Sequence, residues 1–258
     1  MNALQSIRIV LVEPTHPGNI GAVARAIKTM GLQRLVLVNP KKYPHYEASK
    51  RAAGAEDVLD SAVVVPDLAA AIGNCTLVLG TSVRDREVSW PTVTPDQAAQ
   101  MVLEHLPDDD AVQGPREVAV LFGRESSGLS NAELELCQQQ IRIPANDEYS
   151  SLNLASAVQI ICYEMRMAAR RARDAETATQ QGGSAVDQRR QPATRAQQDA
   201  HLAHLESALQ VLDFVKSKPP TVLLRKLARL YNKAQLTTEE VQILRGILSA
   251  IEDRVGRS

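Results

Sequence analysis

Three loops of the sequence carry polar side chains that could hold a ligand or organise a reaction. Asn19 and, six residues later, Arg25 lie at the start of a predicted helix, Glu125 lies in a glycine-rich turn, and Ser151 and Asn153 precede a long apolar-periodic stretch. Amides, hydroxyls and carboxylates can position a substrate, and a guanidinium can clamp a phosphate through its planar fork. The sequence therefore offers a candidate site made of three separate segments.

Taken one at a time, these segments have simpler structural interpretations. Arg25 alone reads as a solvated helix arginine, Glu125 as a surface carboxylate, and Ser150–Ser151 as an N-cap pair that opens a helix over Leu152–Arg173. His16 is a further candidate base on the first loop, because an imidazole changes charge near neutral pH. The first loop lacks the three-glycine dinucleotide fingerprint and the Walker lysine, which disfavours an unrelated enzyme with a nucleotide cofactor.

Six short apolar runs, rich in Val, Ile and Leu, predict strands that are buried on both faces. They are Ile7–Val12, Leu35–Val38, Val63–Val65, Thr76–Gly80, Val118–Phe122 and Ile141–Ile143. Helix signals alternate with them: capping boxes at Thr94 and Ser130, and Asp67 as the cap of a short helix closed by Gly73. This alternation predicts an α/β fold, a parallel sheet with helices on both faces. In such sheets ligands bind beyond the carboxyl ends of the strands, where the three polar loops lie.

The composition changes near residue 174, which predicts three regions. Residues 1–173 carry the α/β pattern, and residues 174–199 are rich in Gln, Ala and Thr and read as a flexible linker. Residues 200–258 read as a small all-helical domain. Its predicted helices are Leu202–Val215, Val222–Lys233 and Glu239–Ile251.

The composition also excludes several classes of protein. Aromatic residues make up 3% of the 258 residues, which argues against aromatic platforms that stack single-stranded bases. Three widely spaced cysteines predict neither a disulfide framework nor a zinc site, and we expect no metal. No apolar run reaches the length of a membrane span, and the N-terminus lacks a signal-peptide pattern. We therefore expect a cytoplasmic protein with no membrane partner.

Charge is divided unevenly along the chain. Residues 1–174 hold 17 basic and 21 acidic residues, whereas residues 175–258 hold 12 basic and 9 acidic ones. Within the tail, Arg225, Arg229 and Lys233 recur every four residues and predict a basic stripe on one helix face. Such a stripe is either a solvated face or a set of phosphate contacts.

Considered together, the three loops resemble the SpoU branch of the SPOUT-class RNA ribose 2′-O-methyltransferases. The matching motifs are Asn19 with Arg25, the run Phe122–Leu129 (FGRESSGL), and Ile143–Pro144 followed by Ser151–Ala155 (SLNLA). Their order and spacing match over about residues 5–165, and the tail also resembles members of this branch that methylate a ribose in the tRNA anticodon loop. The resemblance implies tRNA as the partner, at a cytidine or uridine at nucleotide 32.

The resemblance also implies a cofactor, an assembly and site roles. Members of this class bind S-adenosylmethionine in a C-terminal trefoil knot and work as homodimers. Matched residue by residue, the cofactor-binding positions are Thr81, Ser82, Val83, Gly123, Ile143, Ser150, Ser151 and Leu152.

Arg25 would act on the ribose 2′-oxygen, either as a general base aided by an RNA phosphate or as a clamp on phosphate and oxygen. Asn19, Glu125, Ser151 and Asn153 would position it and the ribose. The tail stripe would then contact tRNA phosphates, since the acidic body is not expected to hold a polyanion. The alternative is a non-catalytic RNA-binding protein of the same fold.

Overall fold

The computed structural model describes residues 3–83, 91–106, 116–178, 191–212, 214 and 220–255. The chain divides into two compact units, Met1–Ser184 and Ala185–Ser258, and each is considered by itself. The first unit holds the α/β pattern and the second holds helices.

The described part of the first unit contains a seven-stranded sheet in the order β3-β2-β1-β6-β4-β7-β5. Every pair of neighbouring strands is parallel, as predicted. The strands are β1 (Ile7–Val12), β2 (Arg34–Val38), β3 (Val63–Val65), β4 (Cys75–Thr81), β5 (Thr92–Val93), β6 (Glu117–Phe122) and β7 (Gln139–Ile141). The prediction missed β5, since two residues carry no apolar-run signal, and placed β7 two residues too late.

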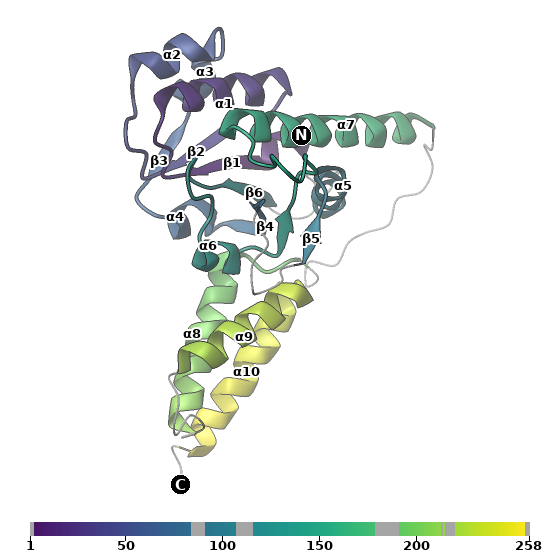
Figure 1. Ribbon diagram of the computed structural model, residues 1–258. Helices are drawn as coiled ribbons and strands as arrows, with labels where there is room; N and C mark the ends of the chain where they lie inside the picture. Colours follow the sequence, from purple (N-terminus) through teal and green to yellow (C-terminus); the bar gives the residue numbers. More distant parts are fainter. Residues whose placement is uncertain are drawn as a thin grey trace. The chain divides into compact units, whose positions relative to one another are not determined.

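Helices cover both faces of this sheet, as predicted, because alternate strand residues enter two separate cores. Ile9 and Leu11 belong to one core and Val10 and Val12 to the other. The first core is covered by α1 (Pro17–Thr29), α2 (Tyr46–Ala52), α3 (Glu56–Asp60), α5 (Pro95–His105) and α7 (Leu154–Ala178), and the second by α4 (Leu68–Ile72) and α6 (Asn131–Glu135). Figure 1 shows α1 and α7 lying along the same side of the sheet, and a 3₁₀ turn at Ala3–Ser6 leads into β1.

Three predicted helix starts are confirmed by their capping contacts. Thr94 and Ser130 each form a complete capping box, with Gln97 and Glu133 respectively. The Asp67 carboxylate accepts a hydrogen bond from the Ala70 N–H at 2.8 Å, which caps α4. These local contacts fix where the chain turns from each strand-side loop into the next helix.

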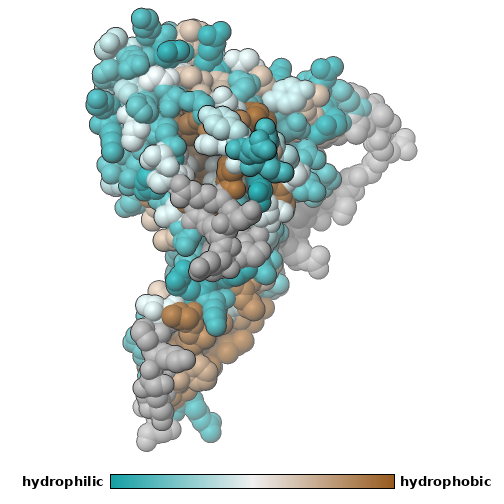
Figure 2. Space-filling view, viewed as in Figure 1, coloured by the Kyte–Doolittle hydropathy of each residue, from teal (hydrophilic) through white to brown (hydrophobic). Residues whose placement is uncertain are grey.

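The second unit contains α8 (Arg195–Val211), α9 (Pro220–Ala234) and α10 (Thr238–Val255). The last two begin within two residues of the predicted helices, whereas α8 begins seven residues before the predicted start at Leu202. Its core is small and centres on Leu205, Ala208 and Leu248. Figure 2 shows apolar side chains on the surface over α9 and α10, and the exposed residues there include Leu230 and Ile247.

The predicted linker, 174–199, was too long at both ends. Helix α7 runs on through Ala178, since the Ala and Glu residues after 174 are good helix formers. Helix α8 begins at Arg195 behind a capping box of Thr194 with Gln197, a signal the prediction overlooked. Residues 179–190 lie outside the described residues.

Candidate active site

A cleft lies at the carboxyl ends of β4, β6 and β7, where the loops after these strands meet. Its lining includes seven of the eight residues predicted to hold a cofactor: Thr81, Ser82, Val83, Gly123, Ile143, Ser151 and Leu152. Ser150 lines an adjoining hollow, which shares Val83 and Ile143 with the cleft. The structure therefore brings together the loop segments that the motifs had linked.

The walls of the cleft combine buried apolar side chains with polar groups. Phe122, Ile141 and Leu154 are buried and form part of the lining. The Ser82 N–H donates to the Ile141 carbonyl at 3.1 Å and so joins the end of β4 to β7. A recess that combines apolar walls with polar groups suits a ligand that has a flat ring and a polar tail.

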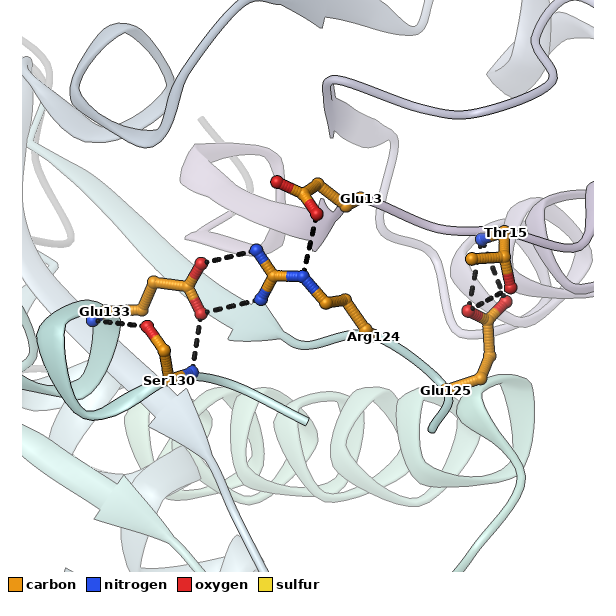
Figure 3. A network of polar contacts seen from close by, with 6 residues as sticks. All are labelled: Glu13, Thr15, Arg124, Glu125, Ser130 and Glu133. Carbon is orange, nitrogen blue, oxygen red and sulfur yellow. Dashed lines mark hydrogen bonds and ion pairs between the residues drawn. The ribbon is translucent and has the colours of Figure 1, made fainter. Parts of the chain in front are cut away.

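Glu125 is the point at which the first and second loops are joined. Its carboxylate accepts the Thr15 hydroxyl at 2.8 Å, the Thr15 N–H at 3.1 Å and the His16 N–H at 3.2 Å. It also accepts the side-chain amide of Asn19 at 3.1 Å. Figure 3 shows this carboxylate pointing at Thr15, on the loop between β1 and α1.

These contacts determine the charge of Glu125. Partial burial alone would raise the pKa of the carboxyl group, but the hydrogen bonds from Thr15 and Asn19 outweigh it and lower the pKa to about 2. Glu125 is therefore an ionised acceptor at neutral pH, not a proton donor. Its role in the site is to hold the first loop in place.

Asn153 joins the third loop to the first. Its side-chain nitrogen donates to the Asn19 side-chain oxygen at 3.1 Å, and its own oxygen accepts the Ala155 N–H at 2.9 Å. The Asn153 carbonyl also accepts the Ala157 N–H at 3.0 Å, so Asn153 is the N-cap of α7. The predicted cap at Ser150–Ser151 and the predicted helix start at Leu152 were wrong, because Asn153 takes that position.

The contacts of Asn19 and Asn153 run in one direction. The Ala155 N–H donates to Asn153, Asn153 donates to Asn19, and Asn19 donates to Glu125. Glu125 can only accept, and this fixes the orientation of both side-chain amides in this series of hydrogen bonds, which we term the relay. Four of the predicted site residues are thereby accounted for as follows: Asn19, Asn153 and Glu125 form the relay, and Ser151 is an exposed residue on the cleft wall.

A second polar network, which sequence reasoning missed, braces the loop after β6. The Arg124 guanidinium donates to Glu13 at 2.8 Å and, through two nitrogens, to Glu133 at 3.0 Å each. Figure 3 shows Arg124 between the two carboxylates, with Glu133 also bound to Ser130 in the capping box of α6. The Glu13 and Glu133 ion pairs raise the pKa of Arg124, so the guanidinium stays charged and paired.

The structure explains why Gly123 is a glycine. A Cβ atom at this position would lie 2.0 Å from the Gly128 carbonyl carbon and 2.1 Å from the Leu129 nitrogen. Glycine is required at this cofactor-binding position because the loop folds back on its own backbone. Gly21 is restricted to glycine by helix packing, since a Cβ there would lie 2.0 Å from the Ala48 carbonyl oxygen of α2.

Arg25 does not join the relay. It lies on α1, its side chain is exposed, and its guanidinium forms no hydrogen bond or ion pair with any residue that the structure describes. His16 is also exposed, and its backbone N–H is what contacts Glu125. The relay thus holds the start of the helix that carries Arg25, while the Arg25 side chain stays available.

The predicted RNA contacts lie in the other unit. Arg225, Arg229 and Lys233 are all on α9, with Arg225 and Lys233 exposed and Arg229 partly buried. Among the described residues, no three metal-ligating side chains cluster, and no helix has the length and apolarity needed to cross a membrane. Cys75, Cys137 and Cys162 are buried free thiols.

Comparison with known proteins gives the family of both units. Residues 6–163 match the model of the SpoU rRNA Methylase family, and residues 196–258 match that of the tRNA methyltransferase TrmJ C-terminal domain. The tRNA (cytidine/uridine/adenosine-2′-O-)-methyltransferase TrmJ of Pseudomonas aeruginosa is 44% identical over 246 residues, covering 95% of this chain and 93% of that protein. The tRNA (cytidine/uridine-2′-O-)-methyltransferase TrmJ of Salmonella choleraesuis is 44% identical over 252 residues, covering 97% and 98%.

Solved structures agree with these matches. The crystal structure of TrmJ from Z. mobilis ZM4 is 35% identical, with a TM-score of 0.76, and the match covers 95% of this chain and 98% of that one. A probable methylase family protein from Haemophilus influenzae Rd KW20 is 38% identical, with a TM-score of 0.63 and 98% of each chain covered. The chain is therefore a methyltransferase of the SpoU family and, over both of its units, belongs to that family's TrmJ group.

Proposed function

We propose that this chain transfers a methyl group from S-adenosylmethionine to the 2′-oxygen of a ribose in tRNA. The proposed target is a cytidine or uridine at nucleotide 32 of the anticodon loop. The observation that carries the proposal is the relay from Glu125 through Asn19 to Asn153, which joins all three motif loops at the cleft. The tRNA methyltransferase activities for which the TrmJ relatives are named support the tRNA substrate.

The cleft fits the cofactor. Its buried Phe122, Ile141 and Leu154 offer apolar walls to an adenine ring, and Thr81, Ser82 and Ser151 add polar groups at the edge. We also propose the trefoil knot that the family resemblance implies. When bound, S-adenosylmethionine would supply an electrophilic methyl group on its sulfonium.

The chain's own residues would align the attacking ribose. A hydroxyl oxygen attacks well only when it is placed in line and its proton is drawn away. The exposed guanidinium of Arg25 is suited to grip an RNA phosphate and hold the 2′-oxygen, and a guanidinium stays protonated in proteins. We therefore favour Arg25 as a clamp over Arg25 as a general base, with the proton of the 2′-hydroxyl passing to the clamped RNA phosphate or to water as the oxygen is methylated. Glu125, Asn19 and Asn153 fix the helix that presents it.

The remaining elements of the proposal concern assembly. We propose a homodimer in which each chain contributes a methyltransferase unit, Met1–Ser184, and a helical tRNA-binding unit, Ala185–Ser258. The basic residues of α9, Arg225, Arg229 and Lys233, would contact tRNA phosphates. We also propose that the enzyme acts in the cytoplasm.

Methylation of bulk tRNA with labelled S-adenosylmethionine, followed by nuclease mapping, tests the proposal. Label in a ribose of the anticodon loop, abolished by Arg25→Ala, is the expected result. Tight binding of both cofactor and tRNA without any transfer would instead favour the alternative, a non-catalytic RNA-binding protein of the same fold.

A further inference from the structure

The segment that follows β2 is strongly basic, in contrast to the acidic unit around it. Lys41, Lys42, Lys50 and Arg51 are all exposed, and Glu47 is the single acidic residue between positions 39 and 52. Residues 1–174 as a whole carry four more acidic than basic side chains. Positive charge is therefore concentrated in this loop and on α2. We term Lys41, Lys42, Tyr46, Lys50 and Arg51 the α2 patch.

An aromatic ring stands exposed among these cations. Tyr46 is 77% exposed at the first residue of α2, and its ring centroid lies 4.9 Å from that of His45. An exposed ring flanked by lysine and arginine is a combination that binds nucleic acid, because the ring stacks on a base while the cations contact phosphates. A single tyrosine of this kind differs from the multi-ring platforms that the composition excludes.

The backbone under the patch is held in place before any ligand arrives. The Asn39 N–H donates to the Val65 carbonyl at 2.9 Å, and the Tyr43 hydroxyl donates to the Leu59 carbonyl at 2.6 Å. The His45 side chain accepts the Glu47 N–H at 3.2 Å and caps α2. Binding to this surface would order only side-chain tips, which lowers its entropic cost.

The patch adjoins the relay of the active site. The Lys41 N–H donates to the Pro14 carbonyl at 3.1 Å, and the next residue, Thr15, binds Glu125. On the other side, Gly18 directly precedes Asn19, and a Cβ at Gly18 would lie 3.6 Å from the Arg51 side chain. Gly21 packs against α2, and Arg25 follows it by one helical turn on the same side of α1.

From this geometry we infer that the α2 patch is a second RNA-binding surface, carried by the methyltransferase unit itself. Its lysines and Arg51 contact phosphates of the strand that enters the cleft, and Tyr46 stacks on a base flanking the methylated ribose. The inference rests on the proposed tRNA substrate and extends it. It also revises the expectation that only the tail contacts phosphates, because a unit with a net negative charge can still carry a local basic surface.

The test measures tRNA affinity and methylation kinetics of the full-length chain. The double variant Lys41→Gln/Lys42→Gln should raise the Kd and KM for tRNA by roughly tenfold and flatten the salt dependence by about one to two log–log units. Tyr46→Ala should weaken tRNA binding by roughly tenfold, whereas Tyr46→Phe should keep it near normal. Affinity for S-adenosylmethionine should stay unchanged in all three, which shows that the cleft is intact.

Two control variants sharpen the result. Tyr163→Ala removes another exposed tyrosine, on α7, and should leave tRNA affinity unchanged. Glu47→Gln removes the one acid of the segment and should tighten tRNA binding.

Unchanged tRNA affinity and salt dependence in the Lys41, Lys42 and Tyr46 variants would overturn the inference, and so would a change of oligomeric state without a change in tRNA affinity. If the wild-type chain transfers no methyl group to tRNA, the proposed function fails, whereas the binding comparison still decides whether the patch contacts RNA.

Discussion

Asn153 donates a hydrogen bond to Asn19 at 3.1 Å although the two residues are 134 positions apart in the sequence. The same Asn153 side chain caps α7, and the same Asn19 side chain holds Glu125. This contact therefore fixes the positions of the starts of α1 and α7 relative to each other and to the loop after β6. Of these two helices, α1 carries Arg25, and the first turns of α7 line the cleft.

Asn153→Asp separates the cap of α7 from the relay. A carboxylate still caps a helix, but it cannot donate to the Asn19 oxygen and would repel it. We expect a melting temperature close to that of the wild type and a kcat for tRNA methylation lower by roughly tenfold to a hundredfold. A normal kcat would show that the Asn153–Asn19 contact has no part in the reaction.

Glu125→Gln should loosen the loop between β1 and α1. An amide cannot accept all the N–H and O–H groups that the carboxylate accepts, and its own NH₂ would face other donors. We expect the free energy of unfolding to fall by about 1–3 kcal/mol, with a parallel loss of turnover. Chemical denaturation and methylation kinetics of the two proteins measure both effects.

The same carboxylate gives the stability of the wild-type chain a pH dependence. Because the pKa of Glu125 is about 2 in the folded chain and ordinarily 4.5, its contribution is complete above about pH 4.5 and is lost as the pH falls toward 2. The difference in melting temperature between wild type and Glu125→Gln should therefore shrink between pH 6 and pH 3. An equal difference at both pH values would contradict the assignment.

Arg25→Ala should reduce methyl transfer by roughly a hundredfold or more and leave S-adenosylmethionine affinity nearly unchanged, because Arg25 lies outside the cleft lining. Arg25→Lys should restore little, since an ammonium is a point charge and cannot replace the planar fork. The control is Lys28→Ala, which removes a cation three residues further along α1 together with its exposed ion pair to Asp57, and should retain most activity. Near-normal turnover of Arg25→Lys would rule out the clamp.

Gly123→Ala should destabilise the chain as well as weaken S-adenosylmethionine binding. The added Cβ would collide with the backbone at Gly128 and Leu129, so the loop must shift, at a cost of about 1–3 kcal/mol. Gly246→Ala is the control and should not destabilise, because the new Cβ would meet no described heavy atom within 4 Å beyond the backbone of its own helix. Calorimetry that finds normal cofactor affinity and a normal melting temperature for Gly123→Ala would contradict this account.

Local patterns of the sequence predicted structure correctly, whereas contacts between distant loops could not be predicted. Strands such as Val118–Phe122 and capping boxes such as Ser130 with Glu133 are local patterns, and the structure confirms them. Asn153 as the cap, and the pairing of Arg124 with Glu13, depend on how distant loops approach one another. Arg124 and Glu13 are 111 positions apart, and no local pattern relates them.

Deleting the helical unit tests which of the two units binds tRNA and which binds S-adenosylmethionine. The cores of the first unit contain no residue of α8, α9 or α10 among those the structure describes, so a chain that ends at Ser184 keeps its own packing. We expect it to remain a folded dimer, to bind S-adenosylmethionine normally, and to lose most of its tRNA affinity. Methylation of tRNA as efficient as that of the full chain would show that the tail is dispensable.

Neutralising the α9 stripe in the full-length chain asks the same question without deletion. Arg225→Gln, Arg229→Gln and Lys233→Gln together should weaken tRNA binding and flatten its salt dependence by up to about one log–log unit for each phosphate that the helix no longer binds. Lys226→Gln is the matched control, because it removes a cation from the same helix about 100° away from Arg225. If Lys226→Gln weakens tRNA binding as much as each stripe variant does singly, the interaction depends on the overall charge of α9 and not on the stripe. A triple variant with unchanged affinity would show that the stripe is a solvated helix face, and would leave the α2 patch as the remaining candidate for holding the RNA.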